Sequence, residues 1–173
     1  NVYVESGAGL KSFISDDEYQ NSGATIIKSS KELLSNADIT LKVLPPSNEE
    51  IDLLKEKSVF ISLCQTTREP ETVKNLTKKK ISAFSMHLIP RTTLAQKMDA
   101  LSSQANIAGY KAVLIAASRL GVYMPLLMTA AGTIRPSKVL VLGAGVAGLQ
   151  AIATAKRLGA QVEAFDVRPV VKE

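Results

Sequence analysis

The chain has 173 residues, of which 46% are hydrophobic and 21% charged, with a formal net charge of +5. This composition is typical of an ordinary soluble globular protein with one sizeable domain or two small ones. The single cysteine, Cys64, excludes an internal disulfide and fits a reducing cytosol, and no apolar run approaches the roughly 20 residues of a membrane span.

Short apolar runs and helix-forming segments alternate through the first half of the chain. Strands are predicted at 2–4, 25–27, 39–44, 59–63 and 81–86, and helices at 15–20, 30–34, 47–54 and 71–76. Pro45 and Pro46 end the third strand, and Ser47 with Glu50 has the spacing of a capping box. Regular alternation of this kind favours a parallel sheet with helices on its faces.

The most obvious basic cluster is the run of three lysines at 78–80, just before an apolar strand. A solvated turn between a helix and a strand is the favoured interpretation, because no aromatic residues interleave with the lysines. The chain has no tryptophan and no recognisable nucleic-acid motif. We therefore expect no nucleic-acid partner.

The second half begins with an irregular polar segment at 91–98, and a single long helix is predicted at 99–120. Four polar residues at i, i+3, i+4 and i+7 share one face of that helix: Asp99, Ser102, Ser103 and Asn106. The stripe is either the solvated side of the helix or a surface that faces a buried polar ligand. Gly121 and Pro125 then indicate a crossing into another domain.

The segment 138–166 has the pattern of a dinucleotide-binding βαβ unit. It opens with a short apolar run, 139–142, typical of a buried parallel strand. Three glycines in a G-x-G-x-x-G pattern follow where the strand must turn into a helix: Gly143, Gly145 and Gly148. The helix is predicted to end at Gly159, and a second strand at 162–165 leads directly to Asp166.

Each part of this pattern has a chemical reason. Gly143 permits the tight turn, Gly145 lets the backbone approach a pyrophosphate, and Gly148 lets the helix pack on the strand. The helix N-terminus offers free N–H groups to the phosphates. Asp166 is placed to accept hydrogen bonds from the adenosine ribose and to repel a 2′-phosphate, which favours NAD(H). Arg168 keeps NADP(H) open as the alternative, since a nearby arginine can accommodate that phosphate.

Six segments carry a more specific pattern than the glycines alone. They are Pro90-Arg91 through Gln96, Asp99-Ala-Leu-Ser-Ser103, Asn106-Ile-Ala-Gly-Tyr110, Met128-Thr-Ala-Ala-Gly132, LGAGVAGLQAIATAKRLGA at 142–160, and Phe165-Asp-Val-Arg-Pro169. Together they closely resemble the NAD(H)-binding domain of the alpha subunit of proton-translocating NAD(P) transhydrogenase. The resemblance covers essentially the whole chain and is strongest from Pro90 onward. Alanine dehydrogenase, which shares the two-domain fold, is the nearest relative to exclude.

The resemblance implies an α/β fold with two Rossmann-like parallel-sheet domains linked by a long helix and NAD(H) in the cleft between them. We expect an N-terminal domain at 1–123 that ends in the long helix at about 99–120, and the first βαβ part of the NAD(H)-binding domain at 124–173. A nucleotide fold of this type usually needs about five or six strands. We therefore interpret the chain as a fragment.

The resemblance also implies a set of cofactor-binding residues. Arg91 and Asp99 would orient the nicotinamide end, and Ser102 would hydrogen-bond the carboxamide. Gln96 would reach the nicotinamide ribose and the incoming NADP(H) domain. The pyrophosphate cradle would be Ala144, Gly145 and Val146, with Asp166, Val167 and Arg168 at the adenosine end. The pattern of the helix face had independently indicated Asp99 and Ser102, whereas Arg91 and Gln96 come from the resemblance only.

The implied reaction is direct hydride transfer from NADH to NADP+ held on a partner domain, coupled elsewhere to proton movement. The implied partner is an NADP(H)-binding beta subunit, and the implied assembly is a homodimer in the cytoplasm, peripheral to the inner membrane. Transfer between two nicotinamide rings exchanges no proton, so we expect no catalytic acid or base and no metal, only positioning by Gln96 and Asp99. The single histidine, His87, is interpreted as structural.

Two alternatives remain. An amino-acid dehydrogenase of the alanine dehydrogenase type needs a base, and in that family a histidine follows the strand that corresponds to 59–63. This chain has Cys64 and Gln65 there, and Cys64 is interpreted as a buried filler. Lys42 matches a lysine that both families keep, so it does not discriminate. The other alternative is a nucleotide-binding module without activity of its own.

Overall fold

A computed structural model of the chain describes residues 1–171, without the side chain of Val170. Internal contacts divide the chain into two compact units, one ending at Pro90 and one starting at Arg91. The sequence placed a domain boundary later, at residue 123. The difference arises because the long helix α5 (Ala100–Arg119) packs against a helix of the second unit, α6 (Val146–Arg157). The domain limits of 1–123 and 124–173 remain a prediction.

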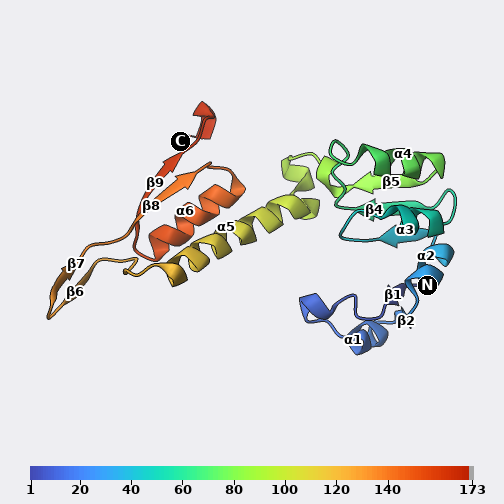
Figure 1. Cartoon of the computed structure of the whole chain (residues 1–173), viewed down its shortest axis with the longest axis horizontal. Helices are drawn as coiled ribbons and strands as arrows, with labels where there is room; N and C mark the ends of the chain where they lie inside the picture. Colours follow the sequence, from blue (N-terminus) through green and yellow to red (C-terminus); the bar gives the residue numbers. More distant parts are fainter. Residues whose placement is uncertain (172–173) are drawn as a thin grey trace. The chain divides into compact units, whose positions relative to one another are not determined.

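The first unit alternates short strands and helices, as the sequence predicted (Figure 1). Its elements are β1 (Tyr3–Glu5), α1 (Asp16–Asn21), β2 (Thr25–Ile27), α2 (Ser30–Asn36), β3 (Ile39–Leu41), α3 (Asn48–Leu53), β4 (Val59–Ser62), α4 (Pro70–Lys78) and β5 (Ser82–Ser85), with 3-10 turns at Leu10–Ser12 and Met86–Leu88. Strands β1 and β2 form one parallel pair, and β3, β4 and β5 form a parallel sheet in that order. The predicted parallel α/β architecture is confirmed.

The start of α3 follows directly from its sequence. The backbone N–H of Glu50 donates to the Ser47 hydroxyl at 3.2 Å, and the backbone N–H of Ser47 donates to the Glu50 carboxylate at 2.7 Å. This is the predicted capping box, which satisfies two N–H groups that would otherwise lack partners. Strand β3 ends earlier than predicted, at Leu41, although Val43 still accepts a hydrogen bond from the Leu63 N–H at 3.1 Å.

The core of the first unit lies on one face of its three-stranded sheet. Phe60, on the central strand, is 1% exposed and packs with apolar residues of α2, α3 and α4. On the other face Ile39, Leu41 and Phe84 are all exposed, Leu41 to 75%. Parallel sheets are normally covered on both faces, and within the first unit the helices cover only one.

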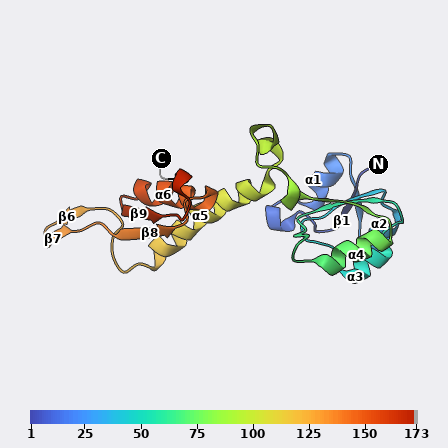
Figure 2. The ribbon, with the colours of Figure 1, turned by 90° about the horizontal axis from the view of Figure 1, so that it is seen from above.

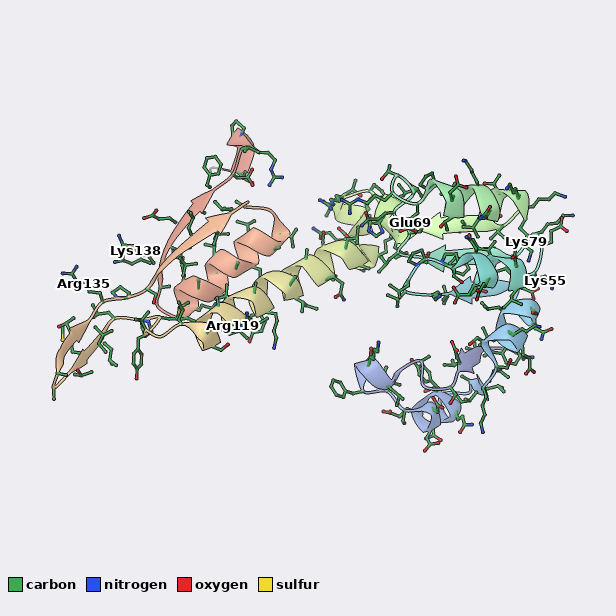
Figure 3. The ribbon with its side chains drawn as sticks, in the orientation of Figure 1. Lys55, Glu69, Lys79, Arg119, Arg135 and Lys138 are labelled. Carbon is green, nitrogen blue, oxygen red and sulfur yellow. The ribbon has the colours of Figure 1, made fainter. Side chains whose placement is uncertain are left out.

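Two of the three lysines at 78–80, Lys79 and Lys80, have structural roles. The Lys79 ammonium donates to the backbone oxygens of Ile51, at 2.9 Å, and Asp52, at the C-terminal end of α3. Lys80 forms an ion pair with Glu56 at 3.0 Å. A cation at a helix C-terminus satisfies carbonyl groups that lack intrahelical partners. Figure 3 shows Lys79 together with Lys55, which pairs with Asp38.

The second unit places its long helix against a βαβ unit. Its elements are a 3-10 segment at Thr93–Met98, α5, β6 (Leu127–Thr129), β7 (Gly132–Ile134), β8 (Lys138–Leu142), α6, β9 (Gln161–Phe165) and a 3-10 turn at Pro169–Val171. Strands β8 and β9 are parallel, and α6 contacts both of them as well as α5. Strands β6 and β7 form an antiparallel hairpin that the sequence analysis did not predict, and it projects away from α6 in both views (Figures 1 and 2).

Helices α5 and α6 cross in close contact at a glycine. Gly109 is buried, and a Cβ built on it would lie 2.1 Å from the backbone oxygen of Ala147. Beside this crossing, the amide of Asn106 donates to the side-chain oxygen of Gln150 at 2.9 Å. Asn106, a member of the polar stripe on α5, therefore forms a hydrogen bond to α6. Among the described residues, no helix combines the length and apolar character needed to cross a bilayer.

Candidate functional site

The turn between β8 and α6 requires glycine at two positions for different reasons. Gly143 has a φ of 100°, in the left-handed region that favours glycine, and its N–H donates to the Phe165 oxygen at 2.7 Å. A Cβ on Gly148 would lie 1.7 Å from the backbone oxygen of Gly143. The helix can therefore begin directly against the turn only with glycine there, as the sequence predicted.

The N-terminus of α6 fits a phosphate group. Gly145 is the N-cap, and no side chain caps the helix. The backbone N–H of Leu149 donates to the Gly145 oxygen at 2.8 Å, which closes the first turn and leaves the N–H groups ahead of Leu149 without intrahelical partners. Uncapped N–H groups and the positive end of the helix dipole together favour an anion.

Asp166 lies at the end of β9, beside the glycine turn. Its Oδ2 accepts from the Ala144 N–H at 2.7 Å and from Arg168 Nη2 at 2.9 Å, while its Oδ1 accepts from the Arg168 backbone N–H at 2.8 Å and from Arg168 Nε at 3.0 Å. The hydrogen bonds from the Arg168 side chain, followed by those from the two backbone N–H groups, hold the pKa of this carboxyl well below its usual range. Asp166 is therefore an oriented carboxylate at neutral pH.

A cavity of about 380 Å³ joins the glycine turn to the first turns of α5. Its lining residues are Arg91, Leu101, Ser102, Ala105, Leu142, Gly143, Gly145, Val146, Ala147, Gly148, Asp166 and Arg168. All of them belong to the second unit. The cavity thus combines the glycine turn, an acidic group and the start of the long helix.

Asp99 acts on this cavity through Ser102. It is the N-cap of α5, and its carboxylate accepts from the Ser102 backbone N–H at 2.9 Å and from the Ser102 hydroxyl at 2.6 Å. The hydroxyl hydrogen bond comes first among the causes that lower the pKa of Asp99, and the charge of Arg91 contributes as well. Ser102 lines the cavity and Asp99 does not, so Asp99 orients the serine from behind.

Three other predicted residues do not line the cavity. Gln96 is exposed in the 3-10 segment before α5. Val167 is 84% exposed, and Ala144 is buried and contributes its backbone N–H to Asp166. Sequence reasoning missed four lining residues: Leu101, Ala105, Leu142 and Ala147. Their signal is weak, since small and apolar residues next to a glycine turn are ordinary packing residues.

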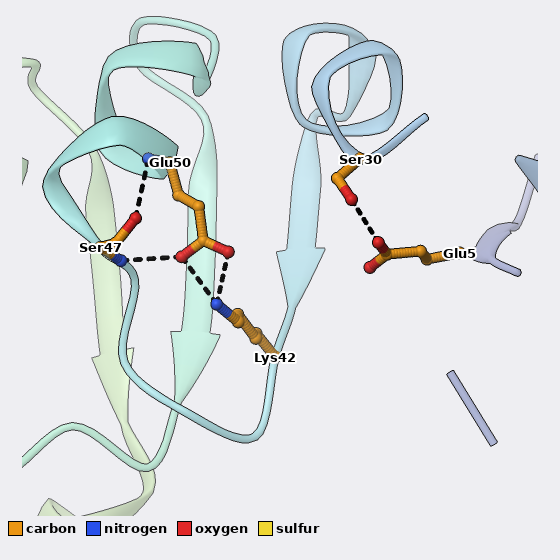
Figure 4. A network of polar contacts seen from close by, with 5 residues as sticks. All are labelled: Glu5, Ser30, Lys42, Ser47 and Glu50. Carbon is orange, nitrogen blue, oxygen red and sulfur yellow. Dashed lines mark hydrogen bonds and ion pairs between the residues drawn. The ribbon is translucent and has the colours of Figure 1, made fainter. Parts of the chain in front are cut away.

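In the first unit, the ammonium of Lys42 is engaged by a neighbouring acid (Figure 4). It lies 2.6 Å from Glu50 Oε2, the same carboxylate that closes the capping box with Ser47. Burial acts to raise the pKa of Glu50, but the hydrogen bonds from Lys42 and Ser47 outweigh it, and the pKa is lowered. Glu5 and Ser30 make a separate hydrogen bond near this network. Lys42 is therefore part of a structural ion pair.

Cys64 and His87 lie near the ends of β4 and β5. Cys64 is 6% exposed, and burial, followed by the hydrogen bond of its thiol to Glu69 at 3.4 Å, raises its pKa to about 11. This environment supports the interpretation of Cys64 as a buried filler. The backbone N–H of His87 donates to the Ser85 hydroxyl at 3.2 Å, and Nδ1 of His87 is buried without a partner among residues 1–171.

Nearly the whole chain matches two domains of one protein family. Residues 1–108 match the alanine dehydrogenase/PNT N-terminal domain, and residues 112–173 match the alanine dehydrogenase/PNT C-terminal domain. The chain is 47% identical to NAD(P) transhydrogenase subunit alpha from Haemophilus influenzae, over 100% of this chain and 33% of that protein. It is 30% identical to alanine dehydrogenase from Methanococcus maripaludis, over 96% of this chain and 45% of that protein. The chain therefore spans about a third to a half of the length of these relatives.

Solved structures agree with the sequence matches. A transhydrogenase from Sinorhizobium meliloti has a TM-score of 0.91 at 48% identity, over 99% of this chain and 51% of that one. An L-alanine dehydrogenase has a TM-score of 0.81 at 26% identity, over 99% of this chain and 47% of that one. The parallel sheets, the glycine turn and these matches over the full chain agree, and the chain belongs to the alanine dehydrogenase/PNT family.

Proposed function

We propose that the chain is the NAD(H)-binding component of a proton-translocating NAD(P) transhydrogenase. The observation that carries this proposal is the cavity of the second unit, where the glycine turn, Asp166, Arg91 and Ser102 line one space. The similarity to transhydrogenase subunits at 45–49% identity supports this reaction over that of alanine dehydrogenase, which is matched at 30–31%.

The two ends of the cavity suit different parts of a dinucleotide. The uncapped N-terminus of α6, at Gly145 and Val146, would hold the pyrophosphate. The Asp166 carboxylate would accept hydrogen bonds from the adenosine ribose, and its charge would oppose a 2′-phosphate. At the start of α5, the hydroxyl of Ser102 would meet the carboxamide, and Arg91 would orient the nicotinamide end.

The cofactor, when bound, would supply the hydride. The contribution of the chain is to fix the geometry of the ring, because direct transfer between two nicotinamides needs no side chain that exchanges a proton. Asp99 holds the Ser102 hydroxyl at 2.6 Å, which restricts the orientation of that hydroxyl. Gln96, exposed in the segment before α5, is available to a partner domain that carries NADP(H).

One structural observation favours this reaction over amino-acid oxidation. Amino-acid oxidation needs a base near neutral pKa, and the group at the relevant strand end is Cys64, whose pKa is raised to about 11. A binding module without activity of its own would keep the same cavity but would not support hydride transfer when a partner is added.

Assembly belongs to the same proposal. The partner is an NADP(H)-binding beta subunit, the chain works as a homodimer, and the assembly lies in the cytoplasm, peripheral to the inner membrane. The domain limits of 1–123 and 124–173 are proposed on the resemblance and on the boundary signals at Gly121 and Pro125.

The test follows NADH consumption by the full-length protein in two mixtures. One contains NADP+ and the NADP(H)-binding domain of the partner, and the other contains pyruvate and ammonia. We expect oxidation in the first mixture only. Oxidation in the second mixture would show an amino-acid dehydrogenase, and NADH binding without oxidation in either would show a binding module.

A variant tests the role of Gln96. Gln96→Asn shortens the side chain by one methylene and keeps its amide, so it should slow hydride transfer roughly tenfold or more while NADH affinity stays nearly unchanged. Hydride transfer and NADH affinity would be measured side by side by rapid kinetics and by titration calorimetry. Loss of NADH affinity at an unchanged rate would contradict the positioning role.

A further inference from the structure

Hydrogen-bond donors occupy all the acceptor positions of the Asp166 carboxylate. A carboxylate offers about four lone-pair positions. Two are taken by backbone N–H groups, those of Ala144 at 2.7 Å and Arg168 at 2.8 Å. The other two are taken by the guanidinium of Arg168, through Nε at 3.0 Å and Nη2 at 2.9 Å. The side chain of Asp166 is only 9% exposed as a result.

Of these four donors, only the two on the Arg168 side chain can move away from the Asp166 carboxylate. The N–H of Ala144 belongs to the glycine turn, whose neighbour Gly143 is fixed by a 2.7 Å hydrogen bond to the Phe165 oxygen. The backbone N–H of Arg168 lies two residues from Asp166 in the same tight turn. The Arg168 side chain, in contrast, is 55% exposed and can rotate into solvent.

The guanidinium also lies over the glycine turn. Its Nη2 is 3.7 Å from the position that a Cβ would take on Gly145, the glycine that allows a phosphate to approach the backbone. Arg168 lines the same cavity as the N-terminus of α6. A ligand that places a ribose diol on Asp166 must therefore move the guanidinium from both the acid and the turn.

We propose that Arg168 is an internal competitor for the ribose diol, which must replace the two guanidinium hydrogen bonds on Asp166 by two hydroxyl hydrogen bonds. This inference rests on the proposed function, because it assumes that the cavity takes an adenosine ribose. The exchange keeps the number of hydrogen bonds on the carboxylate constant, so the carboxylate stays satisfied with and without ligand. The affinity for the diol then depends on the difference in free energy between the two hydroxyl hydrogen bonds and the two guanidinium hydrogen bonds.

The expected effect is modest. An ion pair whose arginine is more than half exposed contributes little free energy, so removing the guanidinium should tighten the binding of a diol about two- to fivefold. The Asp166 carboxylate would stay ionised in such a variant, since the ordinary pKa of an aspartate is 3.8. A ligand with one hydroxyl displaces only one of the two bonds, so it should gain less.

The experiment compares adenosine with 2′-deoxyadenosine in the full-length protein. Neither compound carries a phosphate, so attraction of Arg168 to phosphate does not enter. Affinities would be measured by NMR titration for the natural protein and for Arg168→Met, which keeps most of the aliphatic stem. The control is Arg135→Met, because Arg135 is exposed and lies outside the cavity lining (Figure 3).

We expect Arg168→Met to bind adenosine two- to fivefold more tightly, with a smaller gain for 2′-deoxyadenosine and no change for Arg135→Met. Equal or weaker binding of adenosine by Arg168→Met would overturn the inference. A second measurement needs no variant: the Nε–H proton signal of Arg168 should shift on saturation with adenosine, and an unchanged signal would also overturn it.

NADH binding to the natural protein distinguishes a failure of the proposed function from a failure of the inference about Arg168. Absence of NADH binding would overturn the proposed function and this inference together. NADH binding combined with no gain for adenosine in Arg168→Met would overturn the inference alone.

Discussion

The crossing of α5 and α6 at Gly109 gives the most direct link between packing and the candidate site. In Gly109→Ala, the added Cβ would lie 2.1 Å from the Ala147 oxygen, and real contacts of this kind are essentially never below 3.0 Å. The helices must therefore separate by about 0.9 Å at this point. Neither contact atom can rotate away, because the Ala147 oxygen belongs to the backbone of α6.

Two opposing terms set the size of the effect. Overpacking of a tight interface costs about 1–3 kcal/mol, whereas alanine in place of glycine inside a helix gains up to about 1 kcal/mol. We expect a net loss of about 1–2 kcal/mol in the free energy of unfolding. Separation of the helices also moves Ser102 and Ala105 away from the glycine turn, so NADH affinity should fall about tenfold.

The assay pairs urea unfolding with NADH titration of the same preparations. Gly121→Ala is the matched control, because a Cβ on Gly121 meets no atom within 4 Å. It should unfold and bind like the natural protein, or be slightly more stable. If Gly109→Ala behaved like Gly121→Ala in both measurements, the reasoning from the helix contact would be refuted.

Four further predictions concern three side chains. Cys64, with its pKa raised to about 11 from 9.0, should react with iodoacetamide at pH 8 about 100-fold more slowly than in urea, and equal rates would contradict its burial. Lys79→Met removes two hydrogen bonds to the end of α3 and should cost about 1 kcal/mol in urea unfolding, whereas Lys78→Met, which changes an exposed side chain at the end of α4, should have little effect. Asp166→Ala should weaken NADH binding and narrow the preference over NADPH in parallel titrations, and an unchanged preference would show that Asp166 is not the discriminator. Since the folded pKa of Asp166 is lowered, its contribution to stability is complete above its ordinary pKa of 3.8 and is lost as the pH falls below that value, so Asp166→Ala should flatten the acid limb of a plot of stability against pH.

Much of the candidate site could be predicted because its geometry is local. The glycine spacing at 143–148 depends on backbone relations within a few residues, as does the capping box of Ser47 with Glu50 outside the site. The acid after β9 follows from the βαβ pattern. The pairing of Asp99 with Ser102 follows in the same way from the spacing of one helical turn. These patterns have few alternative conformations, so residue type and spacing are sufficient to predict them.

The remaining features depend on contacts between segments that are distant in the chain. The buried glycine on α5 meets Ala147 only because two helices cross there, and the same crossing assigns the long helix to the second unit. Arg168 is close to Asp166 in sequence, yet its occupation of both carboxylate oxygens depends on the side-chain conformation above the glycine turn. The sequence alone therefore predicted most of the residues that line the cavity, and their binding of a dinucleotide stays a prediction. Only the tertiary structure decided which groups share the cavity and which already bind one another, because side-chain contacts depend on packing that no short pattern specifies.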